Sequence, residues 1–452
     1  MASTTFVVAS TVALLLVASL QSVVAAPSID YLTFTPFSDG DSVATADNLN
    51  GYPVAYLNSY AYIGTPTYYV GSNDSSVGAV YIFLVSGSTA SQVSEITPFY
   101  DASNELALSG TGFFFGGAVA VFASSTSPLL AIAATEFLLV SPVGYVYIYS
   151  LTDPSTPEFV HKLTNPASAG AMFGSALAYS STGSLVVAPS AVDTAGCHAY
   201  IFGSSAVSTG TFCFGASFAT GSFSSTDNFS PAVLVVGDYY ALAASSTGKI
   251  AVGSISECIS PSTPVCTAVQ TYSGVGGDSM AYHAPTSGNG YLLVGDVAQS
   301  KVHIFSCSNL ATCTLSTVSI SVSSVASLGS AVDFAVVSQG LAVVVGNKVT
   351  SSIYFFFCST SGTFNCQAKG SFAGAASSGF GAGLLSISDS EFFVSNAGDT
   401  DIVGLASNPD WIINPTATPS ATPTAGTSAS SSLAINGAAT MVLAIVLGLC
   451  ML

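Results

Sequence analysis

Short runs rich in Val, Ile, Tyr and Phe alternate with polar turns of Gly, Ser, Thr and Asp along most of the chain. In residues 172–202, two β-like runs follow a Phe-Gly pair, and an Ala-Pro, a Gly and a third β-like run come next. Runs of this length, bounded by turn residues, predict antiparallel strands. We expect the four-residue stretch Ser180–Gly183 to be the turn that joins the first two strands.

The same unit recurs along the chain. Similar segments begin at Gly51, Phe115, Phe173, Phe229, Ser279, Leu328 and Phe380, between 49 and 64 residues apart. A period of this size indicates one supersecondary unit repeated radially or linearly. Seven all-β units of about four strands each favour a closed β-propeller, because closure hides the edges of the sheets. A β-solenoid or a pair of β-sandwiches is the alternative.

The two ends of the repeat region predict how the propeller closes. The last unit reaches DIVGLAS (401–407) without a fourth strand, whereas the β-like run 28–38 precedes the first unit and has no blade of its own. We expect residues 28–38 to supply the outer strand of the last blade. The predicted fold is therefore an all-β, seven-bladed β-propeller over residues 27–412, closed by an N-terminal strand and followed by a disordered C-terminal stalk.

Recurring dipeptides in these units resemble a known family. Phe173-Gly174, Val187-Ala188-Pro189, Gly196 and Tyr200-Ile201-Phe202 look like the FG-GAP repeat of integrin α-type β-propellers, and the resemblance spans roughly residues 30–410. Phe115-Gly116 and Phe380-Gly381 match its opening. The resemblance implies a ligand-binding propeller that uses the loops on one rim. Units four to six lack the full Phe-Gly pair.

The N-terminus predicts export. Residues 6–20 form an apolar run too short to span a bilayer, and small residues precede Pro27. This arrangement indicates a signal peptide over residues 1–26.

The C-terminus predicts a membrane tether. Residues 413–432 are rich in Pro, Thr and Ser, which indicates an extended, O-glycosylated stalk. The apolar segment 433–452 ends without a charged residue, whereas a membrane-spanning helix needs about 20 apolar residues and normally has cytoplasmic Lys or Arg. We therefore expect a GPI-attachment signal, with Gly426 and Ser428 as candidates for lipid attachment on the outer leaflet of the plasma membrane. A cleaved or single-pass tail is the alternative.

Composition excludes some partners. Among 452 residues the chain has five Lys and no Arg against 23 acidic residues, for a formal charge of −18. Such a surface cannot neutralise phosphates, which excludes nucleic acid and disfavours anionic lipid headgroups. A low content of charged residues, 6 %, suits a secreted all-β protein.

Nine cysteines predict a set of local disulfides. Cys450 lies in the tail, and the other eight form four pairs that are close in sequence: Cys197/Cys213, Cys258/Cys266, Cys307/Cys313 and Cys358/Cys366. In the last three pairs the first Cys ends a β-like run and the second follows a polar turn, which suits neighbouring antiparallel strands. Export supplies the oxidising compartment. Zinc binding is the alternative, but no CxxC occurs.

No catalytic motif stands out, and we expect no cofactor and no metal. The four histidines are scattered: His161, His198, His283 and His303. His303 is predicted to be a strand histidine at a blade edge. The carboxylate pairs Asp389/Glu391 and Asp399/Asp401 are expected in solvated turns, because nothing nearby would shift their pKa values.

The loops offer few candidates for calcium and glycan sites. Calcium takes six or more oxygens, and the connections between first and second strands are too short or too poor in carboxylates to supply them. Only Asp399 and Asp401 offer two carboxylates in alternation in a longer loop. Asn73 and Asn228 lie in acceptor sequons for N-glycosylation.

Three function classes follow from these patterns. The first is a cell-surface recognition or adhesion module without catalysis, which binds an extracellular protein or glycan through rim loops. The alternative is a structural surface-coat glycoprotein, and the third is an extracellular hydrolase or lyase on a propeller scaffold. A pocket with His, Asp or Glu in a coherent arrangement would favour the enzyme.

Overall fold

The computed structural model describes the strands and many of their turns. The described residues are 28–30, 53–66, 78–86, 89–98, 113–124, 128–136, 143–164, 173–189, 199–204, 207, 214–216, 232–244, 247–258, 268–283, 289–337, 340–360, 364–374, 380–386, 391–395 and 403–407. The predicted signal peptide, stalk and tail lie outside them.

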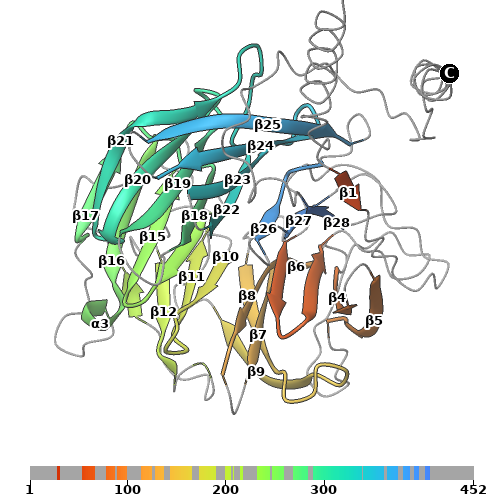
Figure 1. Ribbon diagram of the computed structural model, residues 1–452. Coiled ribbons are helices and arrows are strands. Elements are labelled where there is room, and N and C mark those ends of the chain that lie inside the picture. The colour runs from red at the N-terminus through yellow and green to blue at the C-terminus, as the bar shows by residue number, and fades with distance from the viewer. Residues whose placement is uncertain are drawn as a thin grey trace, which may run out of the picture. The chain divides into compact units, whose positions relative to one another are not determined.

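The fold is an all-β propeller whose described strands form seven four-stranded antiparallel sheets (Figure 1). Three sheets comprise β2 (Val54–Leu57), β3 (Tyr60–Thr65), β4 (Ala79–Ser86) and β5 (Thr89–Ile96); β6 (Phe113–Phe122), β7 (Leu129–Glu136), β8 (Val143–Ser150) and β9 (Glu158–Thr164); and β10 (Phe173–Tyr179), β11 (Leu185–Pro189), β12 (Ala199–Phe202) and β13 (Phe214–Ala216).

The remaining sheets follow the same order, with one short helix, α3 (Ile255–Cys258), after β16. They comprise β14 (Val233–Val236), β15 (Tyr239–Ala244), β16 (Lys249–Ser254) and β17 (Gln270–Ser273); β18 (Ser279–His283), β19 (Gly290–Asp296), β20 (Lys301–Asn309) and β21 (Thr312–Ser321); β22 (Ala331–Val337), β23 (Gly340–Asn347), β24 (Ser352–Ser359) and β25 (Asn365–Ala373); and β26 (Leu384–Ser386), β27 (Glu391–Ser395), β28 (Val403–Ser407) and β1 (Ser28–Asp30).

Burial explains the different composition of the strands within a sheet. The second strands β11 and β23 are buried along their whole length and read as nearly continuous apolar runs. The outermost strand β21 instead has exposed positions along most of its length and is rich in Ser and Thr. Strands between two neighbouring sheets must be apolar on both faces, whereas an outer strand faces water.

The N-terminal strand completes the last sheet, as the sequence predicts. β1 pairs with β28, and Ile29 lies opposite Ala406. Figure 1 shows the red β1 beside the blue β28. In addition, the first strands of the sheets contact one another in an unbroken cycle from β2 through β6, β10, β14, β18, β22 and β26 back to β2. Both ends of the strand region are therefore held in the same sheet.

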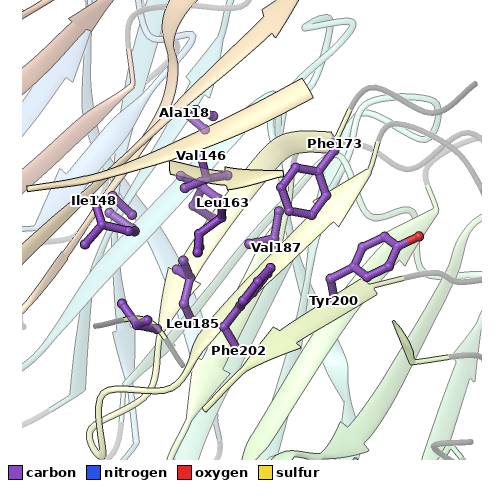
Figure 2. Close-up of a cluster of buried hydrophobic side chains, with 14 residues drawn as sticks. Ala118, Val146, Ile148, Leu163, Phe173, Leu185, Val187, Tyr200 and Phe202 are labelled. Carbon is purple, nitrogen blue, oxygen red and sulfur yellow. The ribbon is translucent and has the colours of Figure 1, made fainter. Parts of the chain in front are cut away.

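The Phe-Gly pairs form the joints between successive sheets. Phe115, Phe173 and Phe380 are buried. The glycine that follows each of them has a positive φ, which glycine adopts without strain. Figure 2 shows Phe173 among Val187, Tyr200 and other side chains of the core that the β6–β9 and β10–β13 sheets share. The motif that resembles FG-GAP thus has a physical role in packing one sheet on the next.

Two of the predicted disulfides are confirmed. Cys307 is bonded to Cys313 and Cys358 to Cys366, and in each case the two residues are direct partners on adjacent strands. Cys258 is also disulfide-bonded, but it ends α3 and not a β-strand, because β16 stops at Ser254. Cys197, Cys213 and Cys266 lie outside the described residues.

The predicted hairpin turn after β10 is confirmed as well. The Ser180 amide donates a hydrogen bond to the Ser184 carbonyl, and the Gly183 amide donates to the Ser180 carbonyl. The Ser184 amide also donates to the Ser180 hydroxyl. Backbone and hydroxyl groups therefore satisfy one another within this turn.

Candidate functional site

The described first strands of the sheets carry few acidic or basic side chains, and two such residues stand out. Within the described residues of these strands, His283 on β18 and Asp333 on β22 are the ones with a basic or acidic side chain. The other positions are apolar, glycine, hydroxyl-bearing or tyrosine residues. A histidine–carboxylate pair at this place in the fold is therefore not part of the general pattern of the repeats.

The two side chains contact each other across neighbouring sheets. Nε2 of His283 lies 3.2 Å from Oδ1 of Asp333. The side chain of His283 is 40 % exposed, whereas that of Asp333 is 10 % exposed. A solvent-accessible imidazole is thus held by a carboxylate that water reaches poorly.

Asp333 is itself fixed by backbone amides. The Phe334 amide donates to Oδ1 at 2.8 Å, and the Ser386 amide on β26 donates to Oδ2 at 2.6 Å. The Phe334 ring lies against the His283 ring in an edge-on arrangement, with 4.7 Å between centroids. Three consecutive sheets therefore define the position of the carboxylate and, through it, of the imidazole.

The repeat explains how residues far apart in sequence meet. Ser279 Oγ donates to the carbonyl of Gly329, and His283 bonds to Asp333, so both contacts join residues that are 50 positions apart. β18 and the segment 329–333 consequently run in the same direction with a fixed offset of one repeat. A pair of side chains one repeat apart becomes a pair in contact.

This arrangement can perform proton transfer. When Nε2 donates to Asp333, the other ring nitrogen, Nδ1, is the one that can accept a proton from a bound molecule. A carboxylate behind a histidine fixes the tautomer and orientation of the ring and stabilises the imidazolium that forms. His283 is accordingly a candidate general base, and Asp333 a candidate positioning residue.

A second histidine–carboxylate pair lies in the interior. Nε2 of His303 on β20 lies 3.3 Å from Oδ2 of Asp296 at the end of β19, and their side chains are 8 % and 2 % exposed. The Gln299 amide donates to Oδ1 of Asp296. Burial lowers the pKa of His303, although its hydrogen bond to Asp296 opposes that change. Because solvent scarcely reaches this pair, its role is structural.

His303 therefore corrects one prediction. It was expected at a blade edge, but β20 has β19 on one side and β21 on the other, so His303 lies in an interior strand.

The neighbouring Asp278 is half-buried and accepts a hydrogen bond from the Val297 amide. Burial raises the pKa of Asp278.

Among the residues that the structure describes, no other predicted polar residues come together. His161 lies on the outermost strand β9, and Glu391 begins β27. The other candidates lie outside the described residues: His198, Asp389, Asp399, Asp401, Asn73, Asn228, Gly426 and Ser428. In the described part of the chain, His, Cys, Asp and Glu side chains nowhere gather in a group of three that could hold a metal ion. The described segments likewise contain no helix with the length and hydropathy needed to cross a membrane.

Comparison with known proteins finds similarity to solved structures but to no protein family. No protein-family model matches the chain, and no curated protein matches it. A periplasmic gluconolactonase of Pseudomonas aeruginosa is similar at 14 % identity, with 78 % of this chain and 94 % of that chain covered and a TM-score of 0.49.

Two further solved structures have similar values. Sqt1 of Chaetomium thermophilum covers 85 % of this chain and 98 % of its own at 13 % identity and a TM-score of 0.48. A protein from Lactobacillus plantarum covers 72 % of this chain and 85 % of its own at 14 % identity and a TM-score of 0.45.

These findings correct the predicted function class. The sequence favoured an adhesion or recognition module without catalysis and placed an extracellular hydrolase or lyase third. The solved structures similar to this chain include that of an enzyme, the gluconolactonase, and no family model matches the chain as an integrin-type propeller. Fold does not determine function, and the absence of a linear motif was no ground for placing the enzyme last. The prediction of a non-catalytic adhesion module is wrong.

Proposed function

We propose that this propeller hydrolyses an acyl ester bond, in a linear ester or a lactone, with His283 as the general base. The observation that carries the proposal is the contact of the partly exposed His283 with the nearly buried Asp333. Both carboxylate oxygens of Asp333 also accept hydrogen bonds from backbone amides. The carboxylate is held by three sheets, so the imidazole has a defined orientation. Such preorganisation is what general-base catalysis requires.

The reaction needs only water as the second substrate. Nδ1 of His283 takes a proton from water while the water oxygen bonds to the acyl carbon and the carbonyl electrons move onto the carbonyl oxygen. The tetrahedral adduct then collapses, the bond to the alkoxy oxygen breaks, and that oxygen receives the proton back from Nδ1. The products are an acid and an alcohol, and His283 is regenerated.

The choice of an acyl bond follows from the number of carboxyl groups. Glycosidases generally use a pair of carboxyl groups that flank the scissile bond, one on each side. The described first strands contain one, Asp333. Hydrolysis of an ester or lactone requires a single oriented base and is the reaction that this pair fits.

The test is ester and lactone hydrolysis by the purified protein and its His283→Gln variant. Loss of a general base typically costs a factor of about 10² to 10⁴, so kcat should fall by that factor while the melting temperature stays the same. His161→Gln, on the outermost strand β9, is the matched control and should keep full activity. An inactive wild-type protein, or a His283→Gln variant as active as the wild type, would refute the proposal.

We further propose that the seven sheets are the blades of one closed ring with FG-GAP-type joints. The cycle of first-strand contacts and the pairing of β1 with β28 support closure. The buried Phe173 followed by Gly174 with a positive φ supports the resemblance of the joint.

We also propose that the protein is exported and tethered by lipid at the cell surface. The disulfides at Cys307 and Cys358 support passage through an oxidising compartment. Phosphatidylinositol-specific phospholipase should release the protein from cells, and its retention when other anchored proteins are released would contradict a lipid tether. Glycosylation at Asn73 and Asn228 and an extracellular partner stay predictions.

A further inference from the structure

We propose that the His283 site accepts acyl substrates without an anionic group and rejects carboxylated or phosphorylated ones. This inference rests on the proposed hydrolysis and specifies its substrate class. It follows from where the chain places its few cations relative to His283.

The structure describes the position of every lysine in the chain. The chain has no arginine, and its five lysines all lie in the described residues. Lys162 and Lys369 lie on the outermost strands β9 and β25. Lys249 and Lys301 begin the third strands β16 and β20, and Lys348 follows the second strand β23.

Strand register places His283 at the opposite end of its sheet from Lys301. His283 pairs with Tyr291 near the start of β19, whereas Asp296 at the end of β19 pairs with Lys301. Each sheet repeats this order, so the starts of third strands and the ends of second strands share one end of the sheets. Lys249 and Lys348 therefore also lie at the end remote from His283.

The end of the sheets that contains His283 carries carboxylates instead. Asp238 lies in the turn from β14 to β15, Glu257 lies in α3 after β16, and Asp153 follows β8. All three are exposed. A chain with a formal charge of −18 already repels anions, and at this end no lysine offsets the carboxylates.

An anionic substrate would thus approach His283 without a cationic partner and against like charge. Like-charge juxtaposition slows encounter and destabilises the complex, and salt screens it with a Debye length of about 8 Å at 0.15 M. Neutral and cationic substrates carry no such cost. The discrimination should therefore be strongest at low ionic strength.

The experiment uses three p-nitrophenyl esters of equal chain length that end in a neutral, a quaternary ammonium or a carboxylate group. At low ionic strength, kcat/KM for the carboxylate ester should be at least about tenfold below that for the neutral ester, and added salt should narrow the gap. Equal or better turnover of the carboxylate ester would overturn the inference and leave the hydrolase intact. Absence of turnover for all three would refute both.

A matched pair of variants separates local charge from net charge. Asn289→Lys adds a cation two residues before Tyr291, the strand partner of His283, whereas Thr350→Lys adds one in the turn after β23 at the remote end. Both positions are exposed, and both changes alter the net charge equally. Asn289→Lys should raise kcat/KM for the carboxylate ester selectively, and Thr350→Lys should not. Equal effects of the two changes would show that no local preference exists.

Discussion

A Cβ added to Gly346 would overlap the carbonyl oxygen of Gly381, so the end of β23 meets the segment leading into β26 through backbone alone. The same relation joins Gly295 to Gly329 and Gly64 to Gly116. Each of these pairs links the second strand of one sheet to the joint of the next. Glycine is required at the second-strand position because any side chain there would collide with the backbone of the next sheet.

Gly346→Ala should therefore destabilise the propeller. The methyl group meets backbone atoms, which cannot rotate away, and overpacking of this kind costs about 1–3 kcal/mol. Gly203→Ala is the control, because a Cβ there meets no atom within 4 Å and its φ is not positive. Urea unfolding of the two variants measures the difference. Equal stability of the two variants would contradict the proposed role of the joint.

The Cys307–Cys313 disulfide should contribute a modest stabilisation. It closes a loop with a sequence separation of 6, for which the chain-entropy estimate is about 2 kcal/mol. Replacing both cysteines by serine should lower the free energy of unfolding by that amount. Replacing Cys358 and Cys366 in the same way should have a similar effect, because that loop is of comparable length. No change in either double variant would show that the bridges are energetically neutral.

Peptide mapping without reduction tests the remaining bridges. Cys197 should be joined to Cys213, and Cys258 to Cys266, because each pair is close in sequence and Cys258 is disulfide-bonded. Cross-links between different repeats, or free thiols at these positions, would contradict this pairing.

His303 should make stability depend on pH. Burial lowers its pKa, so the folded state favours the neutral ring. The stabilisation is complete above the ordinary histidine pKa of about 6.5 and is lost as the pH falls through the lowered value. His303→Gln should reduce the loss of stability in this acidic window. An unaltered pH dependence in His303→Gln would contradict the assignment to His303.

Asp278 should act in the opposite direction. Burial raises its pKa, so its contribution favours folding at low pH and is lost as the pH rises through the raised value. Asp278→Asn should therefore stabilise the protein at pH 7, since the amide oxygen can still accept the Val297 hydrogen bond. Asp153→Asn should instead destabilise it, because hydrogen bonds from Ser155 and Thr156 lower the pKa of Asp153. Denaturant unfolding compares the two, and effects of the same sign would contradict this account.

The repeat made much of the fold predictable. Strand runs, Phe-Gly pairs and close cysteine pairs are local patterns, so the sequence indicated where sheets begin, that Cys307 and Cys313 pair, and that residues near Ser28 complete the last sheet. The end of β16 was less clear, because the apolar run continues through Ile255 into a helix that ends at Cys258.

The candidate site was not predicted, because it depends on contacts between sheets. Hydrogen bonds set the register within a sheet, but side-chain packing sets the offset between neighbouring first strands. The separation of His283 and Asp333 by 50 residues, one repeat, was the available signal. Each residue considered alone looked like an isolated polar position, and the absence of a linear motif then favoured the wrong function class.

Chemical rescue of a His283→Ala variant by imidazole tests the central claim most directly. Removing the side chain should lower the rate of ester hydrolysis by a factor of about 10² to 10⁴, and added imidazole should restore part of it in a saturable manner. The rescue should weaken when Asp333 is also changed to alanine, because the bound imidazole then lacks its carboxylate partner. If imidazole accelerates ester hydrolysis equally in the presence of the variant and in the absence of protein, the result would contradict a catalytic role for His283.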